Sequence, residues 1–361
     1  MHLASLAIRD FRHIQSLDLD FTDSLGRVNE VTAIVGPNTS GKTTVLDAIA
    51  LSIGLLTKIT TLRPGCMLSP GTIVRRGAIQ AKVTAVVHFS PDEVEATRQL
   101  FRLSGRNDYI PECEKVTIEW AFPGHDSRSA ISRSHPKNCW KLFDGRATAA
   151  KLVSTRRADI SWFKKTGGVF TFDQQRTGMG KTIRRDLWEI IQQTNDSNTD
   201  DRYTTDPRTI LLALAVQSQF PPLDPDQLDQ FKIIQQKYNE LCAPHRIIGA
   251  ARIELNDLDI RFDTNGYEFG YEGLSSGEQM MLLFLIKMVT EHINKSIVLI
   301  DELELHHHPV WQRKLLNILP KIGIENQFIF TTHSPYLRDV MPQEAVIDLG
   351  DLETDHRNEQ I

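Results

Sequence analysis

The sequence predicts an α/β fold with a mainly parallel core sheet, an additional antiparallel β lobe and a helical insertion. Three short apolar runs, VTAIV (31–35), SIVLI (296–300) and QFIFTT (327–332), lead into a glycine-rich loop, an acidic pair and a histidine, respectively. Short runs without a polar face are typical of parallel strands that are buried on both sides. Because ligands bind such sheets at the carboxyl ends of the strands, we expect the chemistry immediately after these three runs.

The first half of the chain is expected to be rich in strands. Residues 3–21 alternate between apolar and polar side chains, with an interruption at 10–12, which predicts a hairpin. After VTAIV, the spacing of apolar residues over 42–56 predicts a helix. Residues 60–172 are interpreted as mostly antiparallel sheet. This interpretation depends on three further strand-like runs, at 81–89, 114–122 and 167–172.

The second half changes character. Helical patterns broken by polar linkers occupy residues 181–250, and no heptad run is long enough for a coiled-coil arm. Two alternating stretches then flank Asn265-Gly266, a pair that favours a hairpin turn. The expected organisation is an N-terminal half of the core with the β lobe (1–180), the helical insertion (181–250) and a C-terminal half of the core (251–361).

A glycine-rich loop follows the first apolar run. GPNTSGKTT satisfies G-x-x-x-x-G-K-[ST], with the residues Gly36, Pro37, Asn38, Thr39, Ser40, Gly41, Lys42, Thr43 and Thr44. The glycines allow backbone N–H groups to surround phosphate oxygens, and the helix that follows adds its dipole. Lys42 is expected to reach the β- and γ-phosphates, and the Thr43 hydroxyl to take a Mg²⁺ position. The loop therefore predicts ATP and Mg²⁺ as cofactors.

An acidic pair follows the second apolar run. Asp301 is expected to hold Mg²⁺ through water, and Glu302 to polarise the attacking water as a general base. The alternative interpretation is an acidic pair that stabilises a helix N-terminus through the dipole. The P-loop in the same chain favours the catalytic interpretation.

Two further sites follow strand-like runs. His333, after QFIFTT, is a candidate to hydrogen-bond a γ-phosphate, although a lone histidine is more often structural. Gln174 and Gln175 follow the run at 167–172, and either one is expected to bridge Mg²⁺ and the attacking water. The alternative is that the glutamines lie in a solvated turn. The sequence does not show which of Gln174 and Gln175 has the role.

The segment LSSGE begins an almost unbroken apolar helix. Ser275, Ser276, Gly277 and Glu278 form its polar first turn. A serine, free N–H groups and the helix dipole all favour negative charge at such a turn. The turn is therefore a candidate anion site, and the buried helix behind it makes that site rigid.

The order of these motifs resembles that of an ATP-binding-cassette (ABC) ATPase head. In that family the signature serine and glycine contact the γ-phosphate of ATP held by the partner's P-loop. The resemblance therefore implies a homodimer or higher oligomer with two ATP molecules between the heads. His308 falls where many cassette ATPases place an aspartate that signals across the dimer. A metal site at His306-His307-His308 is not expected, because consecutive histidines cannot all face one ion.

The stretches IRDFRHIQSLDLDF, DELELHHHP and TTHSPYL further resemble ATPases of the overcoming-lysogenization-defect (OLD) group, which is related to structural-maintenance-of-chromosomes (SMC) heads. Relatives of this group include the PtuA-like ATPases of Septu anti-phage systems. The resemblance covers roughly 1–56, 167–176 and 250–340. Leu303 and His307 depart from the proline and leucine usual in the group, but neither change removes a catalytic atom. Arg12 occupies the group's "FR" position and faces either the nucleotide or solvent.

Composition limits the partners. The 41 Lys and Arg residues are outnumbered by 46 Asp and Glu, which excludes a global basic field for nucleic-acid binding. Nucleic acid remains a candidate partner through local pairs, at Arg75-Arg76, Arg156-Arg157, Lys164-Lys165 and Arg184-Arg185. The four separated cysteines predict reduced thiols in a cytoplasmic protein. No apolar run reaches the length of a membrane span, so no membrane partner is expected.

Three functions are compatible with these motifs. The leading hypothesis is an ATPase subunit that regulates a separate effector, a nuclease, in anti-phage defence. The second is an SMC-like DNA-binding or repair protein, against which the lack of a coiled-coil arm counts. The third is the nucleotide-binding subunit of a transporter, to which the β lobe and the insertion are foreign. Only 28 residues follow His333, fewer than the ~100 of an ordinary domain, so no nuclease activity is expected from this chain alone.

Overall fold

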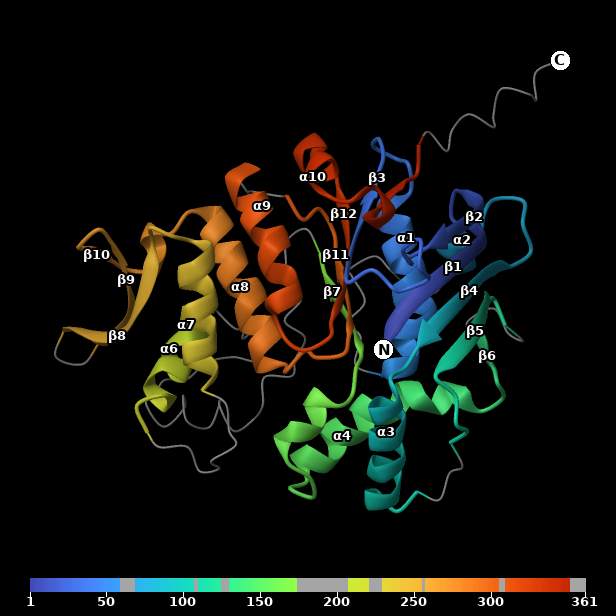
Figure 1. The fold of residues 1–361 in the computed structure, drawn as a ribbon, viewed down its shortest axis with the longest axis horizontal. Coiled ribbons are helices and arrows are strands. Elements are labelled where there is room, and N and C mark those ends of the chain that lie inside the picture. The colour runs from blue at the N-terminus through green and yellow to red at the C-terminus, as the bar shows by residue number, and fades with distance from the viewer. Residues whose placement is uncertain are drawn as a thin grey trace. The chain divides into compact units, whose positions relative to one another are not determined.

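The computed structural model describes residues 1–58, 69–106, 110–124, 130–173, 207–220, 229–254, 257–304 and 309–350. The chain divides into two compact units, each formed from separate segments (Figure 1). The first unit consists of Met1–Gln174, Ile293–Glu304 and Leu316–Ile361, and the second of Gln175–His292 and Leu305–Leu315.

The first unit contains the predicted parallel sheet. Its strand order is β13-β3-β12-β11-β7, and every neighbouring pair is parallel. The strands are β3 (Val31–Val35), β7 (Val169–Phe172), β11 (Ile297–Ile300), β12 (Gln327–Thr332) and β13 (Val346–Asp348). Since β3, β12 and β11 are adjacent, their carboxyl ends meet at one edge, as the sequence predicted.

One strand was assigned to the wrong sheet. The sequence interpretation placed the run at 167–172 in the antiparallel lobe, whereas β7 pairs in parallel with β11. All four residues of β7 are buried, which is the burial pattern of a parallel strand covered on both faces. The carboxyl end of β7 therefore lies at the same edge of the sheet as those of β3, β12 and β11.

The antiparallel lobe is a second five-stranded sheet in the same unit. Its order is β2-β1-β4-β5-β6, which confirms the predicted hairpin and lobe. The strands are β1 (His2–Phe11), β2 (Ile14–Asp20), β4 (Ala81–His88), β5 (Lys115–Phe122) and β6 (Ile131–His135). The region interpreted as mostly sheet also contains the α-helices α2 (Pro70–Ile73), α3 (Pro91–Leu103) and α4 (Gly145–Ser154).

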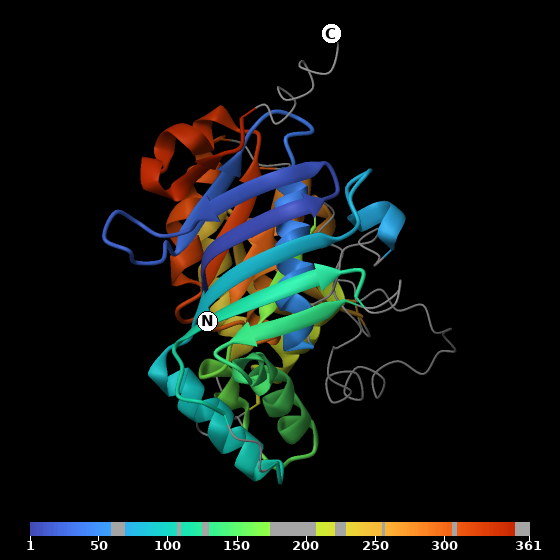
Figure 2. The same ribbon diagram turned by 90° about the vertical axis from the view of Figure 1, so that its right-hand side faces the viewer.

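The helix after the P-loop packs between the two sheets of this unit. It consists of α1 (Lys42–Ile49), a π-helical segment (Ala50–Gly54) and a 3-10 turn (Leu55–Thr57). This helix contacts β1, β4 and β5 on one side and β7 and β12 on the other (Figure 2). The predicted helix at 42–56 is confirmed.

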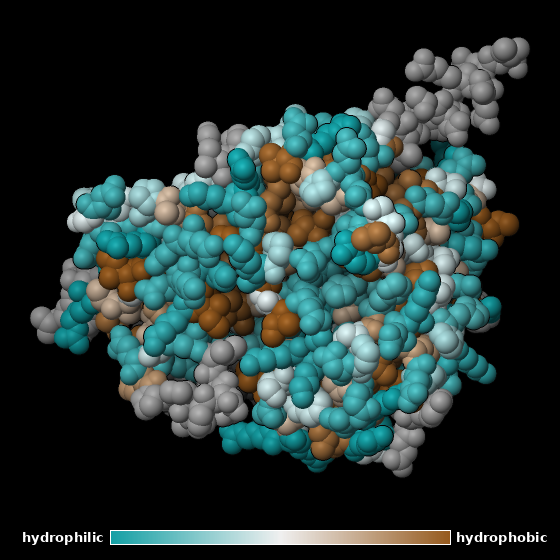
Figure 3. All heavy atoms as spheres, in the orientation of Figure 1, coloured by the Kyte–Doolittle hydropathy of each residue, from teal (hydrophilic) through white to brown (hydrophobic). Residues whose placement is uncertain are grey.

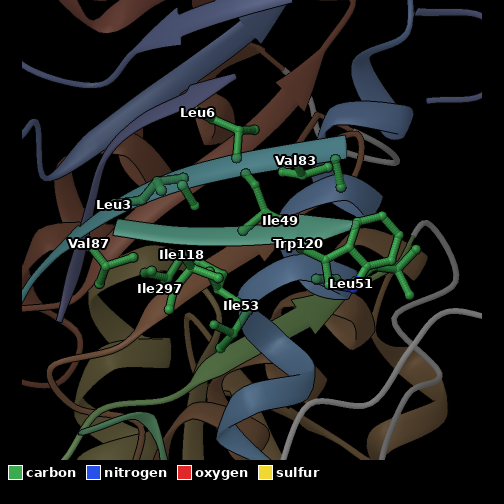
Figure 4. Packing of buried hydrophobic residues seen from close by; sticks show 14 of the residues in the cluster. Leu3, Leu6, Ile49, Leu51, Ile53, Val83, Val87, Ile118, Trp120 and Ile297 are labelled. Atoms are coloured by element: carbon green, nitrogen blue, oxygen red, sulfur yellow. The ribbon is translucent and has the colours of Figure 1, made fainter. Parts of the chain in front are cut away.

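The core of the first unit lies around this helix. Figure 4 shows Ile49 and Ile53 of the helix close to Leu6 and Trp120 of the antiparallel sheet and Ile297 of the parallel sheet, all at most 2% exposed. Each fully buried side chain of this kind contributes about 1.5–3 kcal/mol. Burial on both sides fixes the position of the helix, and therefore of the loop that precedes it.

The second unit combines helices with a small antiparallel sheet. The helices are α6 (Pro207–Gln217), α7 (Gln230–Leu241) and α8 (Ser276–Thr290), and the sheet has the order β10-β9-β8. Its strands are β8 (Arg246–Glu254), β9 (Asp257–Thr264) and β10 (Tyr267–Phe269). Asn265 and Gly266 join β9 to β10 with φ of 53° and 90°, which confirms the predicted hairpin turn.

The remaining helices belong to the C-terminal part. Helix α9 (Pro309–Ile318) begins in the second unit and ends in the first, and α10 (Pro335–Val340) lies in the first.

None of the helices in the described ranges is long and apolar enough to span a membrane. On the face shown in Figure 3, hydrophilic residues predominate and hydrophobic residues form small separate groups, as is usual for protein surfaces.

The cysteine prediction was wrong for one pair. The structure joins Cys113 and Cys139 in a disulfide. Strands β5 and β6 pair Thr117 with His135, and continuing this antiparallel register brings position 113 opposite 139. Linear spacing carries no information about that register. Cys242 is a free, buried thiol, and Cys66 lies outside the described residues.

Candidate functional site

The P-loop turns sharply between β3 and α1. Gly36 and Gly41 have φ of 152° and 93°, a region that favours glycine. A Cβ at Gly36 would lie 2.6 Å from Ser40 Oγ, and one at Gly41 would lie 2.9 Å from His13 Nε2. Ser40 Oγ is buried and has no hydrogen-bond partner within the described part of the chain. A buried polar atom of this kind in a phosphate-type loop is suited to a ligand.

Lys42 points into the loop that precedes it. Its Nζ donates hydrogen bonds to the carbonyl oxygens of Gly36 (2.9 Å) and Pro37 (2.7 Å). Burial lowers the pKa of Lys42, and the nearby carboxylates, that of Glu302 first, act in the opposite direction. The ammonium is thus held by neutral carbonyl groups, which a phosphate would replace with charge-assisted hydrogen bonds.

Thr43 and Asp301 meet at the end of the parallel sheet. Thr43 Oγ1 donates to Asp301 Oδ1 at 2.9 Å, and Thr331 Oγ1 donates to the same oxygen at 2.7 Å. Asp301 is only 1% exposed. The first of these contacts joins residues 258 positions apart and brings the P-loop helix beside the end of β11.

Glu302 leaves the line of β11. Its φ is 51°, a left-handed conformation that is uncommon for a residue other than glycine. The backbone N–H of Glu302 donates to Thr331 Oγ1 at 2.8 Å, and that of Leu303 to the Thr331 carbonyl at 3.1 Å. The turn is therefore fastened to β12, and Glu302 lines the same cavity as the P-loop. Strained backbone at such a position is typical of functional sites.

His333 follows β12 and lines the cavity as well. Its backbone N–H donates to Glu304 Oε1. The other oxygen of that carboxylate, Oε2, is buried without a hydrogen-bond partner in the described ranges. Glu304 thus restrains the backbone from which the His333 side chain projects.

These groups surround one cavity of about 220 Å³. Its ten lining residues all belong to the first unit: His13, Asn38, Thr39, Gly41, Lys42, Thr43, Thr44, Glu302, Thr331 and His333. The sequence therefore predicted most of the cavity lining. Such a site combines a cation, a carboxylate and several hydroxyl groups, which is the chemistry that a phosphate ester with a divalent cation requires.

The turn between β1 and β2 forms part of the cavity lining. Arg12 Nη1 donates to Asp47 Oδ2 at 2.6 Å, and Asp47 lies on α1. Arg12 is therefore neither directed at the cavity nor fully solvated, because it pairs with the P-loop helix. The next residue, His13, lines the cavity, and burial, followed by the charge of Arg12, lowers its pKa.

Thr43 and Asp301 have the chemistry of Mg²⁺ ligands. Thr43 and Asp301 present a hydroxyl and a carboxylate 2.9 Å apart, and oxygen ligands of this kind are those that Mg²⁺ prefers. Within the described ranges no three His, Cys, Asp or Glu residues group closely enough to hold a metal by themselves.

The signature turn lies in the second unit, at the start of α8. Ser275 and Ser276 are exposed, whereas Gly277 is buried and Glu278 is only 2% exposed. Ser275 caps the helix, because its Oγ accepts from the Glu278 N–H, while Glu278 Oε2 accepts from the Ser275 N–H (2.9 Å) and hydroxyl (2.8 Å). The structure thus gives Glu278 a positioning role that the sequence prediction did not include.

Other predicted residues lie outside the described residues. These are Gln174, Gln175, His306, His307, His308, Arg184 and Arg185. Of the remaining basic pairs, Arg156 and Arg157 are both exposed, as are Arg76 and Lys165, while Arg75 and Lys164 are half-buried.

Sequence reasoning missed three residues of the site. Thr331 is the next-to-last residue of β12, where a signal was present because the chemistry was expected at strand ends. Glu304 stood in the quoted stretch DELELHHHP, and a third acidic residue there was a signal as well. His13 carried no such signal, because it comes from a hairpin turn of the other sheet.

Comparisons with known proteins agree with this geometry. Residues 148–339 match the family described as "AAA domain, putative AbiEii toxin, Type IV TA system", and residues 5–241 match an AAA domain family. The chain is 24% identical to the Septu protein PtuA of Bacillus thuringiensis, over 96% of this chain and 76% of that protein. It is 22% identical to the retron Vc95 probable ATPase of Vibrio cholerae serotype O1 biovar El Tor, over 98% and 74%.

The fold is similar to that of SMC heads. The crystal structure of an Smc head bound to the C-terminal winged-helix domain of ScpA superposes with a TM-score of 0.56 and 16% identity, and the similarity covers 96% of this chain and 94% of that one. At this identity the similarity shows the fold alone. The two family matches, each of which covers more than half of the chain, show that the chain belongs to the AAA-domain ATPases.

Proposed function

We propose that this chain hydrolyses ATP with Mg²⁺ in a dimer that closes head to tail around the nucleotide, and that it thereby regulates a separate effector, a nuclease, in anti-phage defence. The observation that carries the proposal is the distribution of the motifs. The P-loop, Glu302 and His333 line one cavity in the first unit, whereas the exposed signature serine lies in the second.

The residues of the cavity have distinct roles in this proposal. The P-loop N–H groups and Lys42 bind the phosphates, and Thr43 and Asp301 hold Mg²⁺, which neutralises phosphate charge when it is bound. Glu302 accepts a proton from the water that attacks the γ-phosphorus, while the bond to the β-phosphate oxygen breaks. His333 donates a hydrogen bond to the γ-phosphate. We also assign Gln174 or Gln175 to the attacking water.

The second copy supplies the other half of the site. Ser275, with the N–H groups near Gly277, contacts the γ-phosphate bound to the partner's P-loop. His308 is assigned to communication across the dimer. The composite arrangement is also supported by the family resemblance of the LSSGE segment.

Complementation between two inactive variants tests the composite site. Ser275→Arg should abolish turnover and leave ATP binding by the monomer intact, whereas Lys42→Ala should weaken binding. Mixing the two should restore hydrolysis, because one site of the mixed dimer combines an intact P-loop with an intact signature. Tyr267→Arg, at a side chain that is 71% exposed, is the matched control. Unchanged turnover in Ser275→Arg, or no recovery on mixing, would contradict the composite site.

The effector is tested separately. The names of two relatives, a Septu protein and a retron probable ATPase, support a defence role. Purification of the native complex followed by mass spectrometry should identify a nuclease that travels with the chain. Its release or activation should depend on ATP and should be lost in Lys42→Ala.

A second candidate function is ATP-dependent DNA binding. It is favoured by the exposed Arg156, Arg157 and Lys165, which have no acidic partner within 4 Å among the described residues. Binding through phosphate contacts would weaken steeply with salt. Titration of duplex DNA at several salt concentrations, with and without ATP, distinguishes this function from effector regulation alone.

A further inference from the structure

One carboxylate connects the signature serine to two other elements of the second unit. Glu278 Oε2 accepts the hydrogen bonds from Ser275, as described above. Its other oxygen, Oε1, accepts from the Tyr238 hydroxyl on α7 (3.3 Å) and from His245 Nδ1, which directly precedes β8. Because a carboxylate is an acceptor, the Nδ1 atom of His245 carries the proton of this contact.

An aromatic cluster holds the two donors in place. The rings of His245 and Phe269 have centroids 5.2 Å apart, and those of Tyr238 and Phe262 are 5.7 Å apart. Phe262 and Phe269 stack on each other at 5.8 Å. Tyr238 is fully buried, and burial raises the pKa of its hydroxyl, which therefore remains a donor. The donors are consequently rigid, because the β9–β10 hairpin fixes their rings.

The hydroxyl of Ser275 has only one proton to donate. Here that proton is donated to Glu278 Oε2, so it is not directed at any external anion. For Ser275 to donate to a phosphate, its hydroxyl must rotate away from the carboxylate. The ease of that rotation depends on how much negative charge Oε2 carries.

The donors at the other oxygen reduce that charge. Hydrogen bonds from Tyr238 and His245 draw electron density toward Oε1, and this polarises the carboxylate away from Oε2. The same hydrogen bonds also stabilise the negative charge of Glu278, which is only 2% exposed and lies beside the turn that is proposed to contact a phosphate. Loss of either donor therefore strengthens the hydrogen bond between Glu278 and the Ser275 hydroxyl. It also leaves more negative charge on Oε2, which repels an approaching anion.

We propose that Tyr238 and His245 are positioning residues for Ser275, and that they act through Glu278 to set how readily the signature serine binds the partner's nucleotide. This inference rests on the proposed composite site. It assigns a function to α7 and to the start of β8, which the motif pattern left without one.

The test uses the full chain carrying Glu302→Gln, which is expected to hold ATP without hydrolysing it. In this parent, the dissociation constant of the dimer is measured by sedimentation velocity with Mg²⁺ and ATP. Adding His245→Ala or Tyr238→Phe should weaken the dimer about tenfold, the effect of one hydrogen bond to a charged group. ATP binding by the isolated monomer should stay within about twofold of the parent, because the P-loop cavity is untouched.

A conservative replacement separates positioning from general stability. His245→Asn keeps an N–H donor close to the position of Nδ1, and it should restore the dimer to within about threefold of the parent. His292→Ala is the matched control, since His292 follows the C-terminal end of α8, whereas Glu278 lies in its first turn, and His292 hydrogen-bonds Gln230, the first residue of α7.

The outcomes distinguish the two levels of the proposal. A parent that does not dimerise with ATP overturns the composite site, and this inference with it. A parent that dimerises, with His245→Ala equally tight, overturns this inference alone. So does a His245→Asn dimer as weak as that of His245→Ala, because the histidine would then act through its shape and not through its donor.

Discussion

The two units differ in how their polar groups are satisfied. In the first unit, Lys42 Nζ donates to two backbone carbonyl groups, Ser40 Oγ is buried without a partner in the described ranges, and Glu302 lines the cavity. In the second unit, Ser275 and Glu278 satisfy each other, and His245 and Tyr238 satisfy what remains. The first unit is therefore preorganised for a ligand, whereas the second is satisfied without one.

This difference indicates that the two units have different functions. A site with unsatisfied groups gains free energy as soon as a suitable ligand arrives. A turn whose polar groups already bond each other has to exchange one hydrogen bond for another when a ligand binds. The free energy that it gains therefore depends on the residues that hydrogen-bond Glu278. Nucleotide binding is thus expected to depend on the first unit, and dimer closure to depend on the second.

The largest expected effect is on catalysis in the first unit. Glu302→Gln should lower the turnover number by about 10²–10⁴-fold, the usual contribution of a general base, while ATP still binds. Phosphate release and binding of a fluorescent ATP analogue measure the two properties. Glu119→Gln, at a side chain 52% exposed on β5, is the control. Persistent hydrolysis in the Glu302 variant would assign the base to another residue.

A core substitution tests whether the two units are energetically distinct. Phe262→Ala removes a fully buried ring from the aromatic cluster and should destabilise the second unit by about 3–5 kcal/mol. Urea denaturation followed by circular dichroism should show a transition at a lower urea concentration than in the wild type. At urea concentrations below that transition, the monomer should still bind ATP. Tyr267→Ala, on the same hairpin but 71% exposed, should change little. Equal loss of ATP binding would show that the units unfold together.

Removal of the P-loop cation should affect binding more than stability. Lys42→Ala deletes charge-assisted hydrogen bonds to phosphate and should weaken ATP binding by about 10–100-fold. Isothermal titration calorimetry measures the affinity, and a thermal melt without nucleotide serves as the stability readout. Lys82→Ala, an exposed lysine on β4, is the matched control. An unchanged affinity would place the phosphates elsewhere.

The last effect concerns pH and the first unit alone. Burial, followed by the charge of the N-terminal amine, lowers the pKa of His2 to about 4. The unfolded chain therefore binds more protons between pH 4 and 6.5, so stability from this residue is fully present above pH 6.5 and is lost as pH falls toward 4. The loss amounts to about 2–3 kcal/mol.

Comparison with a variant isolates this contribution from that of the carboxylates. His2→Gln should flatten the decline in the free energy of unfolding between pH 6.5 and 4, as measured by urea denaturation at each pH. His135→Gln, at a ring 66% exposed, should follow the wild-type curve. Parallel curves for wild type and His2→Gln would show that His2 titrates alike in the folded and unfolded chains.

Local features were predictable because their physics is local. The P-loop glycines, the strand before them and the helix after them are neighbours in sequence, so spacing alone identified them. The Asn265-Gly266 turn was found for the same reason. The run at 167–172 failed because an apolar strand of four residues does not reveal whether its partner is parallel or antiparallel.

The sequence by itself determined the chemical groups of the site. These are the phosphate loop, the acid pair and a histidine, each of which directly follows the last residue of a strand. Only the tertiary structure decided the partners of those groups. Thr331 and Thr43 reach Asp301 from other elements, Glu304 holds the backbone of His333, and His245 meets Glu278. The physical reason is that a hydrogen bond depends on a separation of about 3 Å between two atoms. Chain folding alone sets that separation for residues far apart in sequence.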